Sequence, residues 1–145
     1  MNRRRVLCGL QAAAAIAATR ARAAPQPLPP DEAFQIRPLA KERDWLALEF
    51  RSEPGYFLYA HRFEFAADRS EVRIAEVLLP TGGRRKFDLA LGCEVTYFPG
   101  AVVVRVRIEG LGSAFRLIAR AQGCSDFGLC YPVIERTFAV SGGRP

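Results

Sequence analysis

Apolar residues recur at every second position through much of this chain, and such alternation is typical of β-strands with one buried face. Residues 102–108 are the clearest case, because Val102, Val104, Val106 and Ile108 alternate with residues that include two arginines. The same period occurs in residues 45–50, 57–65, 115–121 and 134–140, and Gly and Pro cluster between these stretches at 53–55, 80–83, 98–100 and 110–112. We therefore predict an all-β fold, an immunoglobulin-like antiparallel β-sandwich.

Helical structure is expected only at the start of this domain, where Asp31 is positioned to cap a short turn within residues 31–36. The chain has 145 residues, a length that suits one domain, and it contains no internal repeat. We expect residues 31–145 to form that domain, preceded by a Pro-rich tether at residues 24–30.

The first 23 residues have the pattern of a signal peptide. Three arginines at 3–5 precede an apolar run at 6–18, and Ala21-Arg22-Ala23 supplies small residues for cleavage. The alternative is a short N-terminal helix of the domain, but residues 12–18 have no polar face to give such a helix an amphipathic period. We predict removal of residues 1–23, by the general or the twin-arginine route, and a soluble periplasmic chain beginning at Ala24, with no later stretch long enough to insert in a membrane.

The positive charge of the chain is concentrated in this leader. The formal charge is +6, but five arginines lie within residues 1–23, which leaves 16 Lys and Arg against 15 Asp and Glu in the remainder. A nearly neutral domain lacks the electrostatic footprint of a protein that binds nucleic acid or an anionic membrane.

Export places the cysteines in an oxidising compartment. Cys8 leaves with the leader, and the residues before it argue against lipid attachment there. Among the other three, Cys124 and Cys130 are the natural pair because the five residues between them include Asp and Gly, which turn the chain. A ring of about 7 residues stabilises by only about 2.4 kcal/mol in the chain-entropy model. Spacing alone leaves a redox role and a structural clip equally open.

The predicted fold favours chemistry at this pair. The cysteine pair occupies the hairpin between the predicted strands at 115–122 and 131–140. The structural disulfide of an immunoglobulin domain instead joins the two sheets across the core. A zinc site is excluded by ligand count, since His61 is the only histidine and no second cysteine pair exists.

The run at residues 122–132, Gln-Gly-Cys, five residues and then Cys-Tyr-Pro, resembles the redox loop of the N-terminal periplasmic domain of the thiol:disulfide interchange protein DsbD. Weaker matches occur in the same order at residues 30–34, 55–59 and 79–80. The resemblance implies a cofactor-free thiol-disulfide oxidoreductase that relays electrons. A thioredoxin-like domain fed by a membrane electron donor would reduce it, and it would reduce disulfide isomerases or thioredoxin-like proteins of cytochrome c maturation.

The resemblance also implies roles for individual residues. Cys130 corresponds to the cysteine that forms mixed disulfides and Cys124 to the one that resolves them. This division agrees with the chemistry, because one thiolate must attack and a second thiol must lie nearby to displace the product. The competing hypothesis is a secreted, non-catalytic immunoglobulin-like binding module with a structural hairpin disulfide.

A cap loop covers the cysteines in that family, and a Phe in it shields the disulfide. The matching residues here are Asp88, Leu89, Ala90, Leu91 and Gly92, so that Ala90 stands in place of the Phe. Either Leu89, Leu91 or Phe87 replaces it as an apolar lid, or the disulfide is less protected. The alternative is that residues 87–91 form an ordinary loop packed on the core.

Other residues complete the expected site. Phe57 and Tyr59 correspond to aromatic residues that approach the cysteines in the family, and Tyr131 belongs to the loop motif. His61 is interpreted as an ordinary strand residue. Cys93 follows the cap directly and is either a third thiol near the pair or, as we favour, a buried inert cysteine.

Overall fold

The computed structural model describes residues 26–110 and 112–142, so the predicted signal peptide and the start of the predicted tether lie outside the described residues. In chain order the elements are α1 (Pro30–Ala33), β1 (Phe34–Glu42), β2 (Trp45–Ser52), β3 (Tyr56–Tyr59), the 3₁₀ turn η1 (Ala60–Arg62), β4 (Glu64–Ala67), β5 (Arg73–Leu78), β6 (Arg84–Asp88), β7 (Cys93–Pro99), β8 (Ala101–Glu109), β9 (Phe115–Ala121), β10 (Gly123–Ser125) and β11 (Ile134–Val140). No helix in the described ranges is long and apolar enough to cross a membrane.

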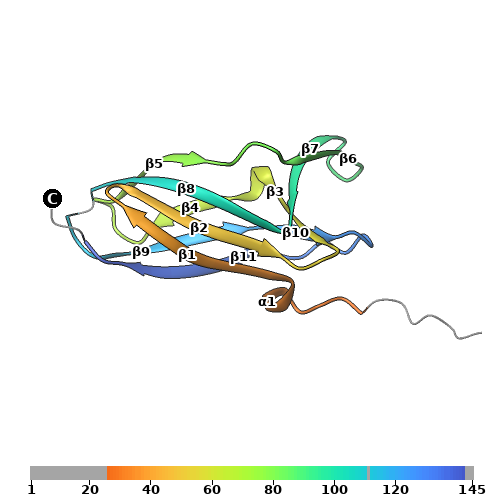
Figure 1. Ribbon diagram of the computed structural model, residues 1–145, viewed down its shortest axis with the longest axis horizontal. Helices are drawn as coiled ribbons and strands as arrows, with labels where there is room; N and C mark the ends of the chain where they lie inside the picture. Colours follow the sequence, from red (N-terminus) through yellow and green to blue (C-terminus); the bar gives the residue numbers. More distant parts are fainter. Residues whose placement is uncertain (1–25, 111, 143–145) are drawn as a thin grey trace, which may run out of the picture.

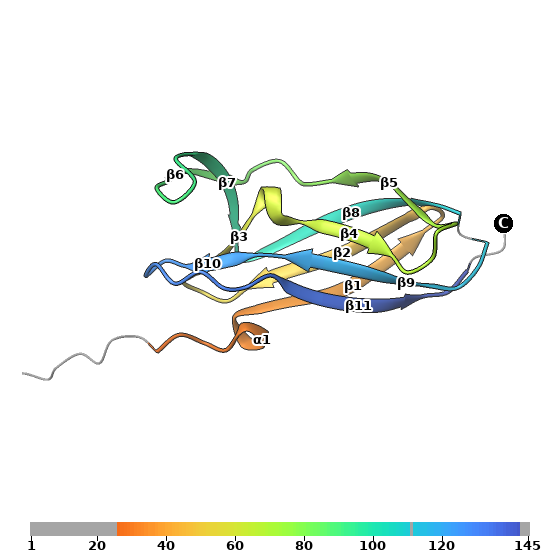
Figure 2. The same cartoon turned by 180° about the vertical axis from the view of Figure 1, so that it is seen from behind.

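Two sheets form the sandwich, and all their strand pairs are antiparallel. One has the order β1-β2-β8-β5 and the other β11-β9-β4, and Figures 1 and 2 show them as the two layers of an elongated molecule. The alternating valines of β8 supply the core, since Val104 and Val106 are fully buried. Phe50 of β2 packs edge-on against Phe63 and Phe65. The predicted all-β antiparallel sandwich is confirmed.

A third sheet, of order β10-β3-β7-β6, lies at one end of the sandwich (Figure 1). It is continuous with both layers, because β3 leads through η1 to β4, β7 leads into β8, and β10 follows β9. Its two faces differ. Leu58 and Phe98 belong to the main core, whereas Phe57, Val95 and Cys124 belong to a separate small cluster. The strand alternation therefore places the second cluster on the opposite face of this sheet.

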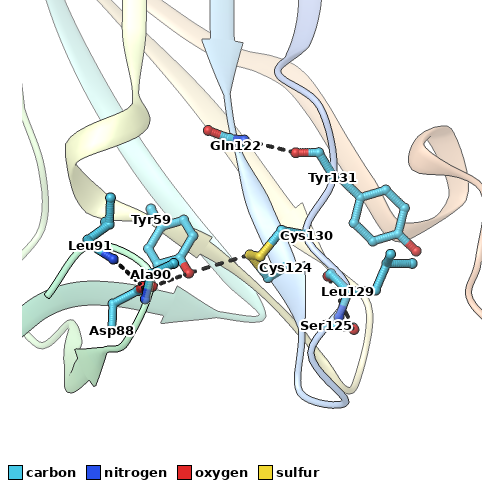
Figure 3. The surroundings of a disulfide bond; sticks show 10 residues. All are labelled: Tyr59, Asp88, Ala90, Leu91, Gln122, Cys124, Ser125, Leu129, Cys130 and Tyr131. Carbon is cyan, nitrogen blue, oxygen red and sulfur yellow. Dashed lines mark hydrogen bonds between the residues drawn. A yellow bond between two sulfur atoms is a disulfide. The ribbon is translucent and has the colours of Figure 1, made fainter.

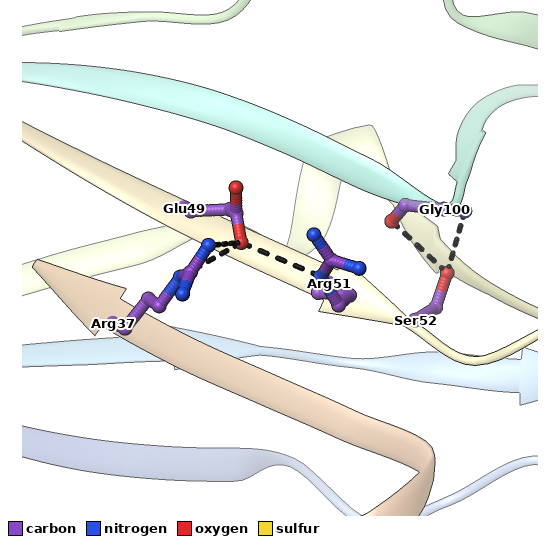
Figure 4. Close-up of polar contacts among 5 residues, drawn as sticks. All are labelled: Arg37, Glu49, Arg51, Ser52 and Gly100. Atoms are coloured by element: carbon purple, nitrogen blue, oxygen red, sulfur yellow. Dashed lines mark hydrogen bonds and ion pairs between the residues drawn. The ribbon is translucent and has the colours of Figure 1, made fainter. Parts of the chain in front are cut away.

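One polar contact fixes the junction between this end sheet and the sandwich. The buried Ser52 at the end of β2 accepts a hydrogen bond from the N–H of Gly100 at 2.9 Å and donates one to its carbonyl at 3.3 Å (Figure 4). Gly100 has φ +73°, which favours glycine, at the corner between β7 and β8. Nearby, the partly covered Glu49 pairs with the exposed Arg37 and Arg51, and ion pairs with such solvent-exposed partners contribute little to stability.

Two details of the prediction are wrong. Residues 57–65 do not form one strand, because β3 pairs with β7 and β10 whereas β4 pairs with β9 of another sheet. The chain changes sheets through η1, so His61 lies in a 3₁₀ turn. The helix also begins at Pro30 with no side-chain cap, and Asp31 lies inside it.

The end sheet depends on Gly123 having no side chain. A Cβ there would lie 2.2 Å from the carbonyl oxygen of Phe57 and 2.7 Å from Cε1 of Phe34. We predict that Gly123→Ala lowers the free energy of unfolding by about 1–3 kcal/mol, because the close pairing of β10 with β3 must open. Gly112→Ala is the control, since nothing lies within 4 Å of its Cβ position. Urea denaturation measures both, and equal stability of the two variants would contradict the role assigned to Gly123.

Candidate functional site

The two cysteines of the predicted pair form a disulfide across a short loop. The loop is closed by its own hydrogen bonds, in which the N–H of Ser125 donates to the carbonyl of Leu129 at 2.7 Å and Ser125 Oγ accepts from the N–H of Leu129 at 3.0 Å (Figure 3). Gly128 has φ +93° and supplies the left-handed residue that the turn requires. The Asp126 N–H donates to the carbonyl of Gly55 and ties the loop to the turn before β3.

The residues that flank the cysteines anchor both ends of the loop. Tyr131 is buried, its N–H donates to the carbonyl of Gly123 at 3.0 Å, and its hydroxyl donates to the carbonyl of Leu28 at 2.7 Å. The amide of Gln122 donates to the carbonyl of Tyr131 at 2.9 Å. The motif at residues 122–132 therefore has a structural reason for its Gln, Gly and Tyr as well as for its cysteines.

The two cysteines differ in their access to solvent. Cys124 lies opposite Phe57 in the pairing of β10 with β3, and only 2% of its surface is exposed. Cys130 follows the turn and is an exposed residue. A reagent approaching from solvent therefore meets Cys130 first, while Cys124 is held against the aromatic residues of β3.

A chain of polar contacts leads from Cys124 to the cap (Figure 3). Tyr59 Oη lies 3.4 Å from Cys124 Sγ and donates a hydrogen bond to Asp88 Oδ2 at 2.7 Å. Asp88 Oδ1 accepts from the N–H groups of Ala90 and Leu91 at 2.9 and 3.1 Å. Asp88 thus orders the cap backbone and the hydroxyl that faces the buried sulfur.

These contacts shift the pKa values of both Tyr59 and Asp88. Burial, followed by the hydrogen bond and the negative charge of Asp88, raises the pKa of Tyr59 to about 12. The hydrogen bond from Tyr59, followed by that from the Leu91 N–H, holds the pKa of Asp88 below its usual range. Near neutral pH the phenol is therefore protonated and the carboxylate ionised.

The apolar residues of the cap point away from the core. Leu89 is 90% exposed, Phe87 63% and Leu91 49%. These exposures contradict an ordinary loop that packs residues 87–91 on the core. None of the three side chains is buried, and Cys130 is exposed. Ala90 and Leu91 lie beside Tyr59 in Figure 3, on the side away from the loop of the cysteines.

Cys93 is exposed, so the prediction of a buried cysteine is wrong. In the strand register it lies opposite Asp88, at the tip of the β6–β7 hairpin, and this hairpin projects beyond the sandwich core (Figure 2). His61 lies in the 3₁₀ turn η1 and not in a strand, but the centre of its ring is still 5.4 Å from that of Tyr59. Within residues 26–110 and 112–142, no three His, Cys, Asp or Glu side chains gather closely enough to hold a metal ion.

Sequence reasoning missed Lys86 of β6. Its ammonium nitrogen lies 3.7 Å from the ring centre of Phe57 and 5.3 Å from the ring centres of Tyr59 and Tyr97. The only sequence signal was its spacing of two from Asp88, which places both on one face of a strand. That signal has no meaning until β6 is known to lie beside β7.

The model of the family described as "Thiol:disulfide interchange protein DsbD, N-terminal" matches residues 24–142 of this chain. The chain belongs to the DsbD N-terminal domain family. It is 37% identical over 131 residues, 90% of its length, to the thiol:disulfide interchange protein DsbD of Ralstonia nicotianae. It is 32% identical over 114 residues, 78% of its length, to DsbD 1 of Pseudomonas aeruginosa. The matched regions are 21% and 19% of those proteins, so the chain spans about a fifth of their length.

Solved structures of the DsbD N-terminal domain family share the fold. The reduced N-terminal domain of DsbD from Neisseria meningitidis matches with a TM-score of 0.70 and 27% identity, over 81% of this chain and 91% of that one. The same domain in a complex with the PilB N-terminal domain matches with a TM-score of 0.66 and 25% identity, over 80% and 88% of the two chains. These matches confirm the immunoglobulin-like fold that the strand pattern predicted.

The contact of Tyr59 with Asp88 makes a prediction about pH. Because its pKa is raised, the stabilisation that Tyr59 provides is complete below pH 10 and is lost as the pH rises toward about 12. Asp88→Asn removes the charge and the acceptor facing Oη, so we expect the pKa of Tyr59 to fall below about 12 while burial keeps it above its usual value.

Ultraviolet titration, taken as the difference from Tyr59→Phe in each background, isolates this group. Glu94→Gln is the control. It removes a carboxylate of β7 that pairs with Arg85, and we expect it to leave the titration of Tyr59 unchanged. A Tyr59 titration that is the same in Asp88→Asn as in the unchanged protein would contradict the assigned hydrogen bond.

Proposed function

We propose that this chain is a periplasmic thiol-disulfide relay. It would accept reducing equivalents from a thioredoxin-like protein supplied by a DsbD-type membrane donor and pass them to periplasmic disulfide proteins. The observation that carries the proposal is the unequal exposure of the two cysteines, one buried against an aromatic cluster and the other an exposed residue. Membership of the DsbD N-terminal domain family supports it.

The chemistry is thiol-disulfide exchange in two steps. A thiolate of the reductant attacks Cys130 Sγ, the bond between Cys130 and Cys124 breaks, and its electron pair passes to Cys124. A second thiolate of the reductant then attacks its own sulfur in the mixed disulfide and releases Cys130 as a thiolate. The relay has gained two electrons, and the reductant has gained a disulfide.

The same steps run in reverse toward an acceptor. The Cys130 thiolate attacks the disulfide of the acceptor, and Cys124 attacks Cys130 Sγ to release the reduced acceptor. Cys124 stays within reach because the pairing of β10 with β3 holds it. In the disulfide form Cys124 Sγ lies 3.4 Å from Tyr59 Oη, whose proton is donated to Asp88.

The partners we propose are thioredoxin-like proteins, and among acceptors a disulfide isomerase or a thioredoxin-like protein of cytochrome c maturation. The Neisseria relative that was solved in a complex with the PilB N-terminal domain supports exchange between proteins. In this chain Cys130 lies on a loop whose Phe127 and Leu129 are 47% and 40% exposed. Exposed apolar side chains around a reactive sulfur suit transient docking of a second protein.

The test uses a thioredoxin with a single active-site cysteine, activated as its mixed disulfide with 5-thio-2-nitrobenzoate. All variants carry Cys93→Ser, because that exposed thiol would react separately. We expect reduced Cys124→Ser to accumulate a covalent adduct with thioredoxin, because Cys130 attacks and no resolving thiol remains. Reduced Cys130→Ser forms none, because Cys124 is buried.

Non-reducing electrophoresis measures the adduct. Equal adduct from the two variants would contradict the roles of the cysteines. Both variants are expected to stay folded, since the small ring contributes only about 2.4 kcal/mol in the chain-entropy model.

A further inference from the structure

Lys86 places a positive charge against the aromatic cluster that also contains Cys124. Its ammonium nitrogen lies over the ring of Phe57 at 3.7 Å, and the rings of Tyr59 and Tyr97 lie at 5.3 Å. The order of the end sheet is β10-β3-β7-β6, so this side chain leaves β6 and reaches across β7 to β3. Aromatic faces attract a cation, and three of them hold the ammonium group in one position.

The residue under the ammonium group is the strand neighbour of the buried cysteine. Phe57 and Cys124 are opposite each other in the pairing of β3 with β10 and share the small cluster on the outer face of the sheet. Lys86 is half-buried, so water screens its charge less than that of a fully exposed lysine. Tyr59 connects the two groups, because its ring centre lies 5.3 Å from the ammonium nitrogen and its Oη lies 3.4 Å from Cys124 Sγ.

Opening of the disulfide creates a charge that needs such a partner. When Cys130 is attacked, Cys124 leaves as a thiolate in a site where only 2% of its surface is exposed. Asp88, linked to the same sulfur through Tyr59, already carries a negative charge there. Two negative charges at one partly buried site repel each other and disfavour ionisation of the second group.

We propose that Lys86 is a positioning residue of the exchange reaction, whose ammonium group offsets the charge of Asp88 and stabilises the thiolate form of Cys124. The inference rests on the proposed relay function and deepens it. Lys86 would then affect two rates: the rate at which the Cys124 thiolate attacks the mixed disulfide, and the rate at which Cys124 departs as a thiolate when Cys130 is attacked.

The charged and titratable side chains on this face come from four elements: Arg84, Lys86 and Asp88 of β6, Tyr59 of β3, Cys93 and Tyr97 of β7, and His61 of η1. Arg84 is exposed and lies opposite Tyr97, at the other end of β6 from Asp88. Lys86 is thus the cation of this group for which contacts with all three rings are found.

The test observes Cys124 alone and needs no partner protein. Reduced protein carrying Cys93→Ser is mixed with 5,5′-dithiobis(2-nitrobenzoate) in a stopped-flow instrument. The exposed Cys130 thiolate attacks the reagent and releases one thionitrobenzoate. The Cys124 thiolate then attacks Cys130 Sγ and releases a second, which closes the protein disulfide. The rate of the second phase against pH follows the ionisation of Cys124.

We expect Lys86→Met, which keeps the apolar stem, to move the pH midpoint of the second phase upward by roughly half to one unit and to slow that phase by about 3- to 10-fold near pH 7. Lys86→Arg restores the midpoint because it restores the charge. Arg85→Met removes a charge from the adjacent residue, which pairs with Glu94, and leaves the midpoint unchanged.

Three results would overturn the proposal: an unchanged midpoint in Lys86→Met, an equal shift in Arg85→Met, or a shift in Lys86→Arg as large as in Lys86→Met. Lys86→Gln replaces Lys86→Met in each comparison if the methionine variant does not fold. Release of only one thionitrobenzoate per molecule of the unchanged protein would contradict the relay function itself, whereas a normal second release insensitive to Lys86 contradicts only this inference.

Discussion

The antiparallel pairing of β10 with β3 is the contact on which the site depends. It sets Cys124 opposite Phe57 and, through the turn at Gly128, leaves Cys130 at the surface. The close approach of the two strands requires Gly123. The side-chain amide of Gln122 donates to the carbonyl of Tyr131 and so fixes the segment that follows Cys130. One short strand thereby produces the asymmetry between a reachable sulfur and a protected one that stepwise exchange requires.

The fold separates the part that provides stability from the part that changes redox state. The sandwich core contains fully buried side chains such as Phe50 and Val104, and truncating residues of this kind typically costs about 2–5 kcal/mol. The disulfide lies outside that core, in a second cluster on the end sheet, and its small ring contributes about 2.4 kcal/mol in the chain-entropy model. The domain can therefore lose and regain the bond while the sandwich stays folded.

The strands at residues 102–108, 115–121 and 134–140 were predictable because each has one core face and one solvent face. The others depend on tertiary structure: β1 is mostly exposed and has no hydrophobic period, and all four residues of β3 are buried. The Cys124–Cys130 pair could be found from its motif. Lys86 could not be found from the sequence, because its contacts depend on the strand order of the end sheet. Free cysteines are usually buried, but Cys93 lies at the tip of a hairpin and is exposed.

The central claim is that the Cys124–Cys130 bond opens and closes in the working protein, whereas a structural clip would stay closed. Thiol trapping in cells tests this most directly, by acid quenching, alkylation of free thiols and comparison of the full chain with and without the DsbD-type membrane reductant. Our account predicts a partly reduced protein in the presence of that reductant and a shift to the oxidised form when it is removed. A protein that is fully oxidised under both conditions would contradict the account and leave the pair as a structural clip.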